Sequence, residues 1–433
     1  MSNVVALAGE LFNSVSRMAT PPVPSDAHSL FPIAGLSDDN LSNPFVFGSA
    51  SADRLIDFDL NEVLNGGMEA VGSGPPANWV DRSVAPGSVV RTTTAGEFHA
   101  GAAGMELASS TGDAIGAQDV RARAGERWNV TARIKSNGSA FVEIRVQCLE
   151  TGKYLAAGGT WQTTPTYFLR SSTGGGSFTL VGPSAFTVET MSAVPGLPPT
   201  VTLRFSAVLE TNSVTAWVDE FYAWPSWSFA GIWGHNLVPA IAVELYRGDT
   251  SPAATLETTF TVRRPTFHWS GISSGTIRDQ RYVRLKTVGS YPAGIHVLNA
   301  IALGEFVLGQ GRILAQNPKY GVEVRRIEAQ DRMRMRLGDE TVFLYSDDAR
   351  RVWSAPYEWY SQTQLVEAQE ELYLRTRNGA HSMVWLPDDT NPREVIYGRF
   401  ASPETGEVQD LLTLWKNGGD MTIEGQPFPT WDT

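Results

Sequence analysis

The stretch from Val214 to Leu237 constrains the fold of this chain more than any other. Polar and apolar side chains alternate from Val214 onward, as is typical of a β-strand, and the alternation predicts Trp217, Asp219 and Phe221 on one face. A proline ends this run because it has no N–H for the ladder, and a second apolar run begins at Phe229. The stretch therefore predicts the last strand of one β-module followed directly by the first strand of another. Such an arrangement favours a structural role over a catalytic one.

Short alternating segments continue through much of the chain. Between residues 81 and 222 they are joined by Gly, Ser, Thr and Pro turns and show no helical period. The chain also contains 13 Trp, and large aromatic side chains are enriched in sheets. A length of 433 residues allows several domains with separate cores. We therefore predict an all-β, multi-domain protein built from β-sandwich or jelly-roll domains.

Charge and cysteine content exclude several classes of protein. The sequence carries 34 Lys and Arg against 46 Asp and Glu, which gives a net charge of −12. A negative surface repels phosphate backbones and anionic lipids, so nucleic acid and membranes are not expected partners. Cys148 is the only cysteine, and its alternating apolar neighbours predict a small core residue. The N-terminus lacks a basic segment, which argues against a signal peptide.

The N-terminal segment is expected to form a helical arm. Apolar residues at helical spacing predict a helix over residues 2–19, with Leu11 and Val15 in its apolar stripe, and several prolines follow it. A helix of this length is marginal alone in water, so the stripe requires a docking surface. That surface is either the same chain or a neighbouring subunit.

The C-terminal residues 313–433 are richer in charged side chains and predict a compact β domain carrying one helix over 361–378. Within this domain, Arg332, Arg334 and Arg336 line one face of a predicted strand. The basic stripe is either a solvated edge or a surface that pairs with an acidic patch on a neighbouring subunit. We favour the second interpretation.

The best candidates for a carbohydrate-binding surface are Trp161 and Tyr167, which lie in a loop-rich stretch, but packing in the core or against a subunit is the favoured interpretation of both. Sugar rings stack on exposed aromatic side chains. Catalysis is not expected. The six histidines are scattered, and the Gly271–Gly275 segment, which matches a nucleophile-elbow pattern, leads into a predicted strand where that chemistry needs a helix.

Residues 61–225 resemble the jelly-roll carbohydrate-binding modules. The matching segments are Leu64-Asn-Gly-Gly-Met-Glu69, Ala124-Gly-Glu-Arg-Trp128 and Trp217-Val-Asp-Glu220. The resemblance implies that Glu69 and Asp219 hold a structural calcium ion, with backbone carbonyls completing its oxygen shell. The alternative is that both carboxylates accept hydrogen bonds from a turn. No other cofactor is expected.

The flanking segments, residues 25–60 and 226–312, resemble one discoidin-type (galactose-binding-like) sandwich that the jelly roll interrupts. They include Trp233-Gly-His-Asn-Leu237 and Gln280-Arg-Tyr-Val-Arg-Leu285. With an arm at residues 1–24, the whole order is similar to structural proteins of tailed-bacteriophage tails. This resemblance implies a virion component made in the host cytoplasm, with copies of itself and other tail proteins as partners. The alternatives are an adhesin that binds a host surface glycan and a glycoside hydrolase with accessory modules.

Overall fold

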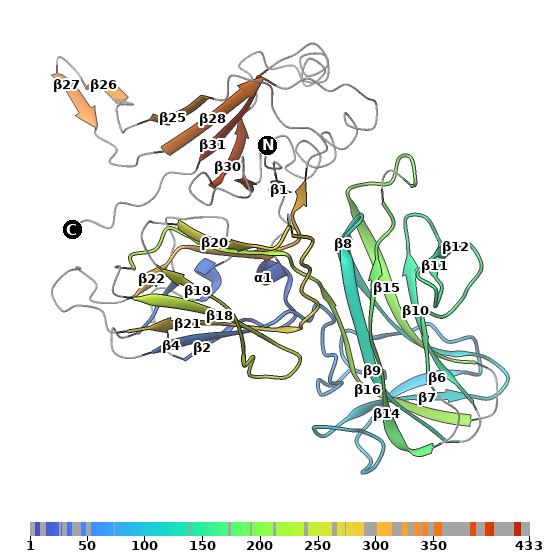
Figure 1. Ribbon diagram of the computed structural model, residues 1–433. Coiled ribbons are helices and arrows are strands. Elements are labelled where there is room, and N and C mark those ends of the chain that lie inside the picture. The colour runs from blue at the N-terminus through green and yellow to red at the C-terminus, as the bar shows by residue number, and fades with distance from the viewer. Residues whose placement is uncertain are drawn as a thin grey trace. The chain divides into compact units, whose positions relative to one another are not determined.

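The computed structural model of the protein is built almost entirely of antiparallel β-strands, so the predicted all-β class is confirmed (Figure 1). The structure describes residues 5–8, 14–25, 27, 33–36, 45–48, 53–72, 74–137, 140–171, 175–190, 193–210, 214–237, 241–261, 266–272, 274–289, 301–313, 323–327, 333–337, 340–344, 350–356, 382–386, 395–401 and 420–425. None of the helices within these ranges is long and apolar enough to cross a membrane.

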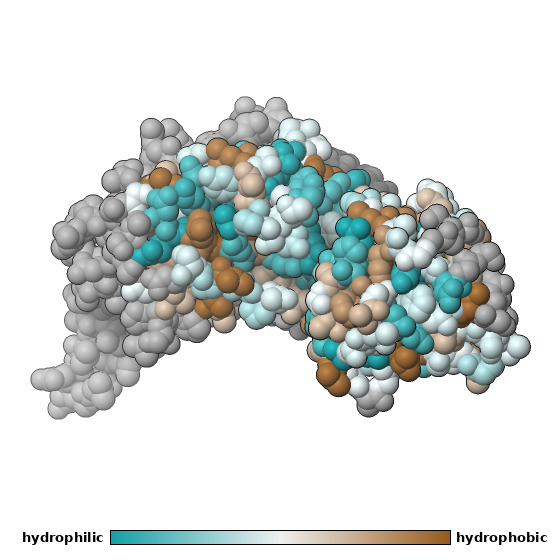
Figure 2. Space-filling view, turned by 90° about the horizontal axis from the view of Figure 1, so that it is seen from below, coloured by the Kyte–Doolittle hydropathy of each residue, from teal (hydrophilic) through white to brown (hydrophobic). Residues whose placement is uncertain are grey.

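The chain folds into two compact units. The first comprises residues 1–17, 21–59 and 227–433, and the second comprises residues 18–20 and 60–226. The second unit is thus flanked on both sides by segments of the first. Large apolar side chains that remain exposed are scattered through the sequence, and the hydrophobic residues in Figure 2 form separate groups among hydrophilic ones.

The second unit is a jelly-roll-type sandwich of two sheets. The first, called here the β15 sheet, has the order β12-β11-β10-β15-β8-β5, with β13 also paired to β10. Its strands are β5 (Val80–Asp81), β8 (Ala114–Arg123), β10 (Val142–Cys148), β11 (Tyr154–Leu155), β12 (Trp161–Gln162), β13 (Leu169–Arg170) and β15 (Thr200–Leu209). The second, called the β16 sheet, has the order β14-β9-β16-β7-β6. Its strands are β6 (Ser88–Thr92), β7 (Gly104–Ser109), β9 (Arg127–Asn137), β14 (Gly175–Thr187) and β16 (Val214–Pro225).

Alternation places the core of the second unit between these two sheets. On β10 the side chains of Val142, Ile144, Val146 and Cys148 are all buried in one cluster, as the sequence predicts for Cys148. Trp128 of the β16 sheet and Phe205 of the β15 sheet pack with ring centroids 5.8 Å apart. Burial of these inward faces leaves the alternate side chains of both sheets on their outer faces.

The first and last segments of the second unit are hydrogen-bonded to each other. The Glu62 N–H donates to the Ala223 carbonyl at 2.9 Å, and the Ala223 N–H donates to Asn61 Oδ1 at 3.0 Å. Asn61 is buried, so these bonds are shielded from water. The unit therefore begins and ends at one place on its own surface.

A β-bulge in β16 breaks the alternation predicted for this strand. Asp219 lies opposite Arg133 of β9, but the next paired residue, Tyr222, lies opposite Thr131. Val218 and Phe221 therefore both face the core, and the expectation that Phe221 shares a face with Trp217 and Asp219 is wrong. The reason is that Glu220 adopts a positive φ of 47°, which inserts an extra residue into the strand. The consecutive side chains of Asp219 and Glu220 therefore both lie on the side of the sheet away from the core.

The described strands of the first unit form five sheets. A five-stranded sheet has the order β19 (Thr255–Thr261)-β18 (Ala242–Gly248)-β21 (Tyr282–Val288)-β4 (Arg54–Asp59)-β2 (Val23–Pro24). Three smaller sheets have the orders β20 (Thr266–Ser270)-β17 (Phe229–Trp233)-β23 (Glu305–Gly309), β22 (Ala302–Leu303)-β3 (Phe45–Val46) and β26 (Met333–Leu337)-β27 (Glu340–Leu344). A seven-stranded sheet has the order β24 (Arg312–Ile313)-β1 (Val5–Ala8)-β29 (Met383–Leu386)-β30 (Ile396–Ala401)-β31 (Asp420–Gly425)-β28 (Arg350–Pro356)-β25 (Glu323–Ile327). Residues Ile33–Leu36 form a 3-10 turn, η2.

The predicted N-terminal helical arm is not what the structure shows. Residues Val5–Ala8 form strand β1, which pairs with β29 on one side and β24 on the other, and the helix α1 covers only Ser14–Arg17. The helical interpretation of residues 2–19 is therefore wrong at β1. A short apolar segment is marginal as an isolated helix, whereas between two strands its N–H and C=O groups enter hydrogen-bonded ladders.

Side chains from both sides of residue 313 share one core cluster in the first unit. Trp233 and Val307 pack with Val384 and Tyr397, and the rings of Trp233 and Tyr397 lie 5.3 Å apart. A separate C-terminal domain beginning at residue 313 stays a prediction. The expected helix over 361–378 lies outside the described residues.

Candidate functional site

The outer face of the β15 sheet gathers polar, charged and aromatic side chains from neighbouring strands. We call this surface the β15 face. It comprises Asp119, Arg121, Glu143, Arg145, Gln147, Tyr154, Gln162, Arg170, Thr202, Arg204 and Ser206. These residues alternate with the buried core positions of the same strands, so their side chains point away from the core.

Register places five of these side chains in one row across five strands. Asp119 of β8 pairs with Arg204 of β15, Arg204 pairs with Gln147 of β10, Gln147 pairs with Tyr154 of β11, and Tyr154 pairs with Gln162 of β12. Adjacent strands lie about 4.8 Å apart, so the row spans about 19 Å. That length matches several successive units of an extended chain-like ligand.

Ion pairs fix several of the charged side chains of the β15 face. Arg204 Nε and one terminal nitrogen donate to the two carboxylate oxygens of Asp119 at 2.7 and 2.8 Å, a bidentate geometry. Arg145 bridges two carboxylates, donating to Glu143 Oε2 at 2.7 Å and to Glu210 Oε1 at 2.8 Å. Because these guanidinium and carboxylate groups are already held in place, their side chains would not need to become ordered when a ligand binds.

Tyr167, one of the two predicted sugar-stacking residues, lies at the rim of the β15 face. The guanidinium carbon of Arg170 is 5.2 Å from its ring centroid and 3.8 Å from the ring centroid of Phe141. Arg170 also lies 3.7 Å from Glu143. Tyr167 is therefore connected through Arg170 to Glu143 of the β15 face.

Trp161, the other predicted residue, points to the opposite side of the same sheet. Its register partner is Leu155, a core residue, and its ring packs against the core near Phe186 at 6.4 Å. The indole N–H donates to the Thr187 carbonyl at 3.0 Å. Trp161 thus packs inward, as in the favoured interpretation of this residue, and Tyr154 is the aromatic residue that the outer row contains.

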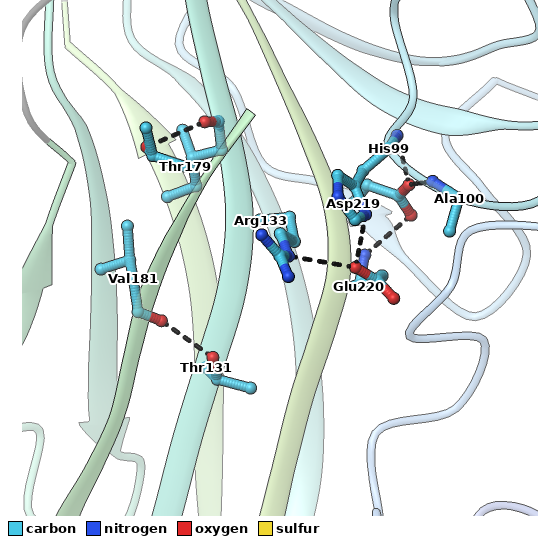
Figure 3. Close-up of polar contacts among 9 residues, drawn as sticks. His99, Ala100, Thr131, Arg133, Thr179, Val181, Asp219 and Glu220 are labelled. Carbon is cyan, nitrogen blue, oxygen red and sulfur yellow. Dashed lines mark hydrogen bonds and ion pairs between the residues drawn. The ribbon is translucent and has the colours of Figure 1, made fainter. Parts of the chain in front are cut away.

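Glu69 and Asp219 both bind the segment from His99 to Ala102. Asp219 Oδ2 accepts the N–H groups of His99 and Ala100 at 2.7 and 2.9 Å, and Figure 3 shows this carboxylate beside both nitrogens. Glu69 accepts the Ala102 N–H at 2.9 Å through Oε1 and at 3.1 Å through Oε2. Two carboxylates that are 150 positions apart in the sequence thereby hold one loop. The sequence resemblance paired the same two residues as calcium ligands.

Gly101 makes this close approach possible. It has a φ of +72°, and a side chain there would meet Glu69 Oε1. The next carboxylate, Glu220, turns away from the loop backbone. Its Oε2 lies 2.8 Å from His99 Nδ1 and 3.3 Å from Arg133 Nε (Figure 3).

The placement of Glu69 and Asp219 fits hydrogen bonding better than calcium binding. Calcium requires six to eight oxygen ligands, whereas all four oxygens of this pair already accept backbone N–H groups. Within the described ranges, no group of three or more His, Cys, Asp or Glu side chains is placed to hold a metal ion. The geometry corresponds to the alternative in which both carboxylates accept turn hydrogen bonds.

Burial raises the pKa of the Asp219 carboxyl above its ordinary value of 3.8, although the N–H donors act in the opposite direction. The folded state therefore holds this proton more tightly than the unfolded state. The resulting stabilisation is complete below pH 3.8 and is lost as pH rises through the raised pKa.

We expect the unfolding free energy of the wild type, relative to Asp219→Asn, to increase as pH falls from 7 to 4. Only the wild type titrates at this position, so the difference isolates the Asp219 proton. Denaturant titrations of both proteins at several pH values measure it. A difference that is constant with pH would contradict the raised pKa.

The residues predicted for subunit contacts are dispersed. Val15 lies in α1 and is 4% exposed, so its side chain is buried within the chain. Arg334 and Arg336 lie on β26, which pairs with β27. Leu11 and Arg332 lie outside the described residues. Subunit contact through these residues stays a prediction.

Sequence reasoning did not identify Tyr154, Arg204 or Asp119. Alternation in Phe141–Leu149 and Val201–Leu209 indicates which positions face outward, and it was available from the sequence. The pairing of these strands was not, because β8, β10 and β15 are separated by long stretches of chain and their register is set by packing.

Comparisons with known proteins identify no family for this chain. No protein-family model and no curated protein matches it. Similar solved structures include the carbohydrate-binding module TmCBM61 in complex with β-1,4-galactotriose, at 15% identity over 38% of this chain and 98% of that one, with a TM-score of 0.26. The CBM22-1 xylan-binding domain of Paenibacillus barcinonensis Xyn10C matches at 12% identity over 37% of this chain and 91% of that one, with a TM-score of 0.23. The enzymatically active domain of bacteriophage CBA120 tailspike protein 4 matches at 12% identity over 38% of this chain and 21% of that one, with a TM-score of 0.27. At these TM-scores, the likeness carries no conclusion about what this chain binds.

Proposed function

We propose that the second unit binds carbohydrate through the β15 face. The observation that carries this proposal is the row from Asp119 to Gln162, in which a tyrosine ring, two amides and an Arg–Asp pair lie side by side on one flat surface. Sugar recognition combines apolar contact with a ring face and directional hydrogen bonds to hydroxyl groups, and this row supplies both.

The scaffold supports the same proposal. The central strands of the row, β15 and β10, pair over seven residues, and β15 pairs with β8 over ten. Side chains on paired strands are placed more firmly than side chains on loops, which reduces the entropy lost upon binding. The row spans about 19 Å, so it suits an extended glycan rather than a small ligand.

Replacing Tyr154 with alanine should weaken glycan binding by about fivefold without changing the fold, because the ring lies on the outer face and stacking is worth about 1 kcal/mol. Trp161→Ala is the matched aromatic variant on the adjacent strand, and it should instead lower the melting temperature, because Trp161 packs inward. Affinity electrophoresis in soluble polysaccharides and thermal unfolding measure the two effects. Loss of binding in Trp161→Ala at unchanged stability would place the site elsewhere.

We further propose that the protein carries this surface within a tailed-phage virion and uses it to contact a host surface glycan. The support is the order of domain types that the sequence resembles. Immunogold labelling of phage particles with an antibody against the second unit tests the proposal. Labelling of the tail or its tip supports it, and finding the protein only as a non-structural product would refute it.

We also propose that the protein binds glycan without cleaving it. On the β15 face, the carboxylates of Asp119 and Glu143 accept hydrogen bonds from arginine side chains, whereas glycoside hydrolysis needs a carboxylic acid placed to protonate the leaving group. Incubation with polysaccharides that bind should release no new reducing ends.

A further inference from the structure

We infer that the glycan bound by the β15 face is anionic and carries carboxylate or sulfate groups. This inference rests on the proposed function and specifies the class of ligand. It follows from the hydrogen bonds that the charged side chains of this face already form within the protein.

Four carboxylates lie on the β15 face or at its margin, namely those of Asp119, Glu143, Glu150 and Glu210, and each accepts at least one hydrogen bond within the protein. Both oxygens of Asp119 accept from Arg204, and Glu143 Oε2 accepts from Arg145. Glu210, at the end of β15, accepts from Arg145 through Oε1. Glu150, in the turn after β10, accepts the Thr202 N–H through both oxygens at 2.9 Å. Six of these eight carboxylate oxygens therefore already accept a hydrogen bond within the protein, which leaves few of them to accept from a ligand hydroxyl.

Guanidinium donors, in contrast, are in excess. Arg121 on β8 is exposed and forms no ion pair with any residue that the structure describes. Arg82 approaches Asp119 only to 3.8 Å, and Arg170 approaches Glu143 only to 3.7 Å, both beyond hydrogen-bond distance. Among the residues that the structure describes, three of the five arginines at this surface thus have no hydrogen-bond acceptor for their guanidinium N–H groups.

This excess of hydrogen-bond donors favours a ligand whose groups accept hydrogen bonds and do not donate them. A hydroxyl both donates and accepts, whereas a carboxylate or sulfate only accepts and pairs with the planar guanidinium in a bidentate manner. The balance of charge points the same way. Arg82, Arg121, Arg145, Arg170 and Arg204 outnumber the four carboxylates here, in a chain whose net charge is −12.

The test compares the full-length protein on glycans that differ only in charge. The probes are β-1,4-glucan, β-1,4-galactan and α-1,4-galactan oligosaccharides, each in neutral form, oxidised to the carboxylate at C6, and sulfated at C6. We expect an anionic form to bind at least tenfold more tightly than its neutral counterpart at low salt, and this advantage should shrink at 0.5 M salt, where the Debye length is about 4 Å.

Arg121→Gln should remove about tenfold of the affinity for the anionic form and leave the melting temperature unchanged, because the side chain has no ion-pair partner in the described structure. Arg121→Lys keeps the charge but loses the planar fork, so it should restore only part of the affinity. Lys135→Gln is the matched control. It removes one positive charge from β9, in the other sheet of the same unit, and should leave glycan affinity unchanged.

The outcomes separate this inference from the proposed function. Equal or tighter binding of neutral forms, with no effect of Arg121→Gln, would leave carbohydrate binding intact and overturn the anionic class. No binding of any probe would overturn both. Preference for the oxidised over the sulfated form would identify the anion as a uronate, and the reverse preference would identify a sulfated glycan.

Discussion

Replacing Asp219 with alanine is expected to lower the free energy of unfolding by about 3 kcal/mol. Asp219 is fully buried and accepts the N–H groups of His99, Ala100 and Glu220, so alanine would leave three donors without this acceptor. The amides of His99 and Ala100 should exchange with deuterium about a hundredfold faster. Denaturant unfolding and hydrogen exchange measure the two quantities. Unchanged exchange at these amides would mean that Asp219 does not hold the loop.

Two further experiments separate hydrogen bonding from calcium. Asp219→Asn retains one carbonyl oxygen and should therefore be less destabilising than Asp219→Ala. Treatment of the wild type with a calcium chelator should leave exchange at residues 99–102 unchanged, because the carboxylates contact the backbone directly. A loss of protection upon chelation, reversed by added calcium, would support the calcium site implied by the sequence resemblance.

Deleting residues 1–8 is expected to destabilise the seven-stranded sheet of the first unit. Four residues of β1 pair with the four residues of β29, and all four side chains of β29 are buried. The deletion leaves one side of β29 without ladder partners and creates an exposed apolar edge. At about 1 kcal/mol for each lost hydrogen bond, the amides of Met383–Leu386 should exchange at least a hundredfold faster, and the protein should aggregate more readily.

A shorter deletion of residues 1–4, which precede β1, is the control and should have little effect on this sheet. Exchange at β29 that remains slow after the longer deletion would show that β1 is not part of the sheet. That result would restore the interpretation of the N-terminal segment as an arm available to a neighbouring subunit.

Local sequence pattern predicts the composition of individual strands well. Alternation in the segment before Cys148 identifies which side chains enter the core, because the period of two is a property of the strand itself. The same rule fails at β16, where Glu220 inserts an extra residue and brings Phe221 back to the core side. A positive φ at a glutamate has no marker in the sequence, so this bulge could not be anticipated.

The candidate site is less predictable than the strands because it is non-local. Tyr154, Arg204 and Asp119 become neighbours only through the register of paired strands. Trp161 was a candidate because tryptophan stacks well on sugars, yet its strand position places it with Leu155 on the core side. The N-terminal segment shows a related limitation. Its few apolar residues fit a helical period, and the partner strand that determines its conformation lies almost 400 residues away.

The hydrogen bonds that join Asn61 and Glu62 to Ala223 have an evolutionary consequence. They fix the distance between the two chain ends of the sandwich by contacts internal to it, independent of the protein in which it resides. A gene segment encoding residues 60–226 can therefore recombine into another surface loop as a self-contained cassette. Under the proposed function, exchange of such cassettes would change the glycan that the recipient protein binds.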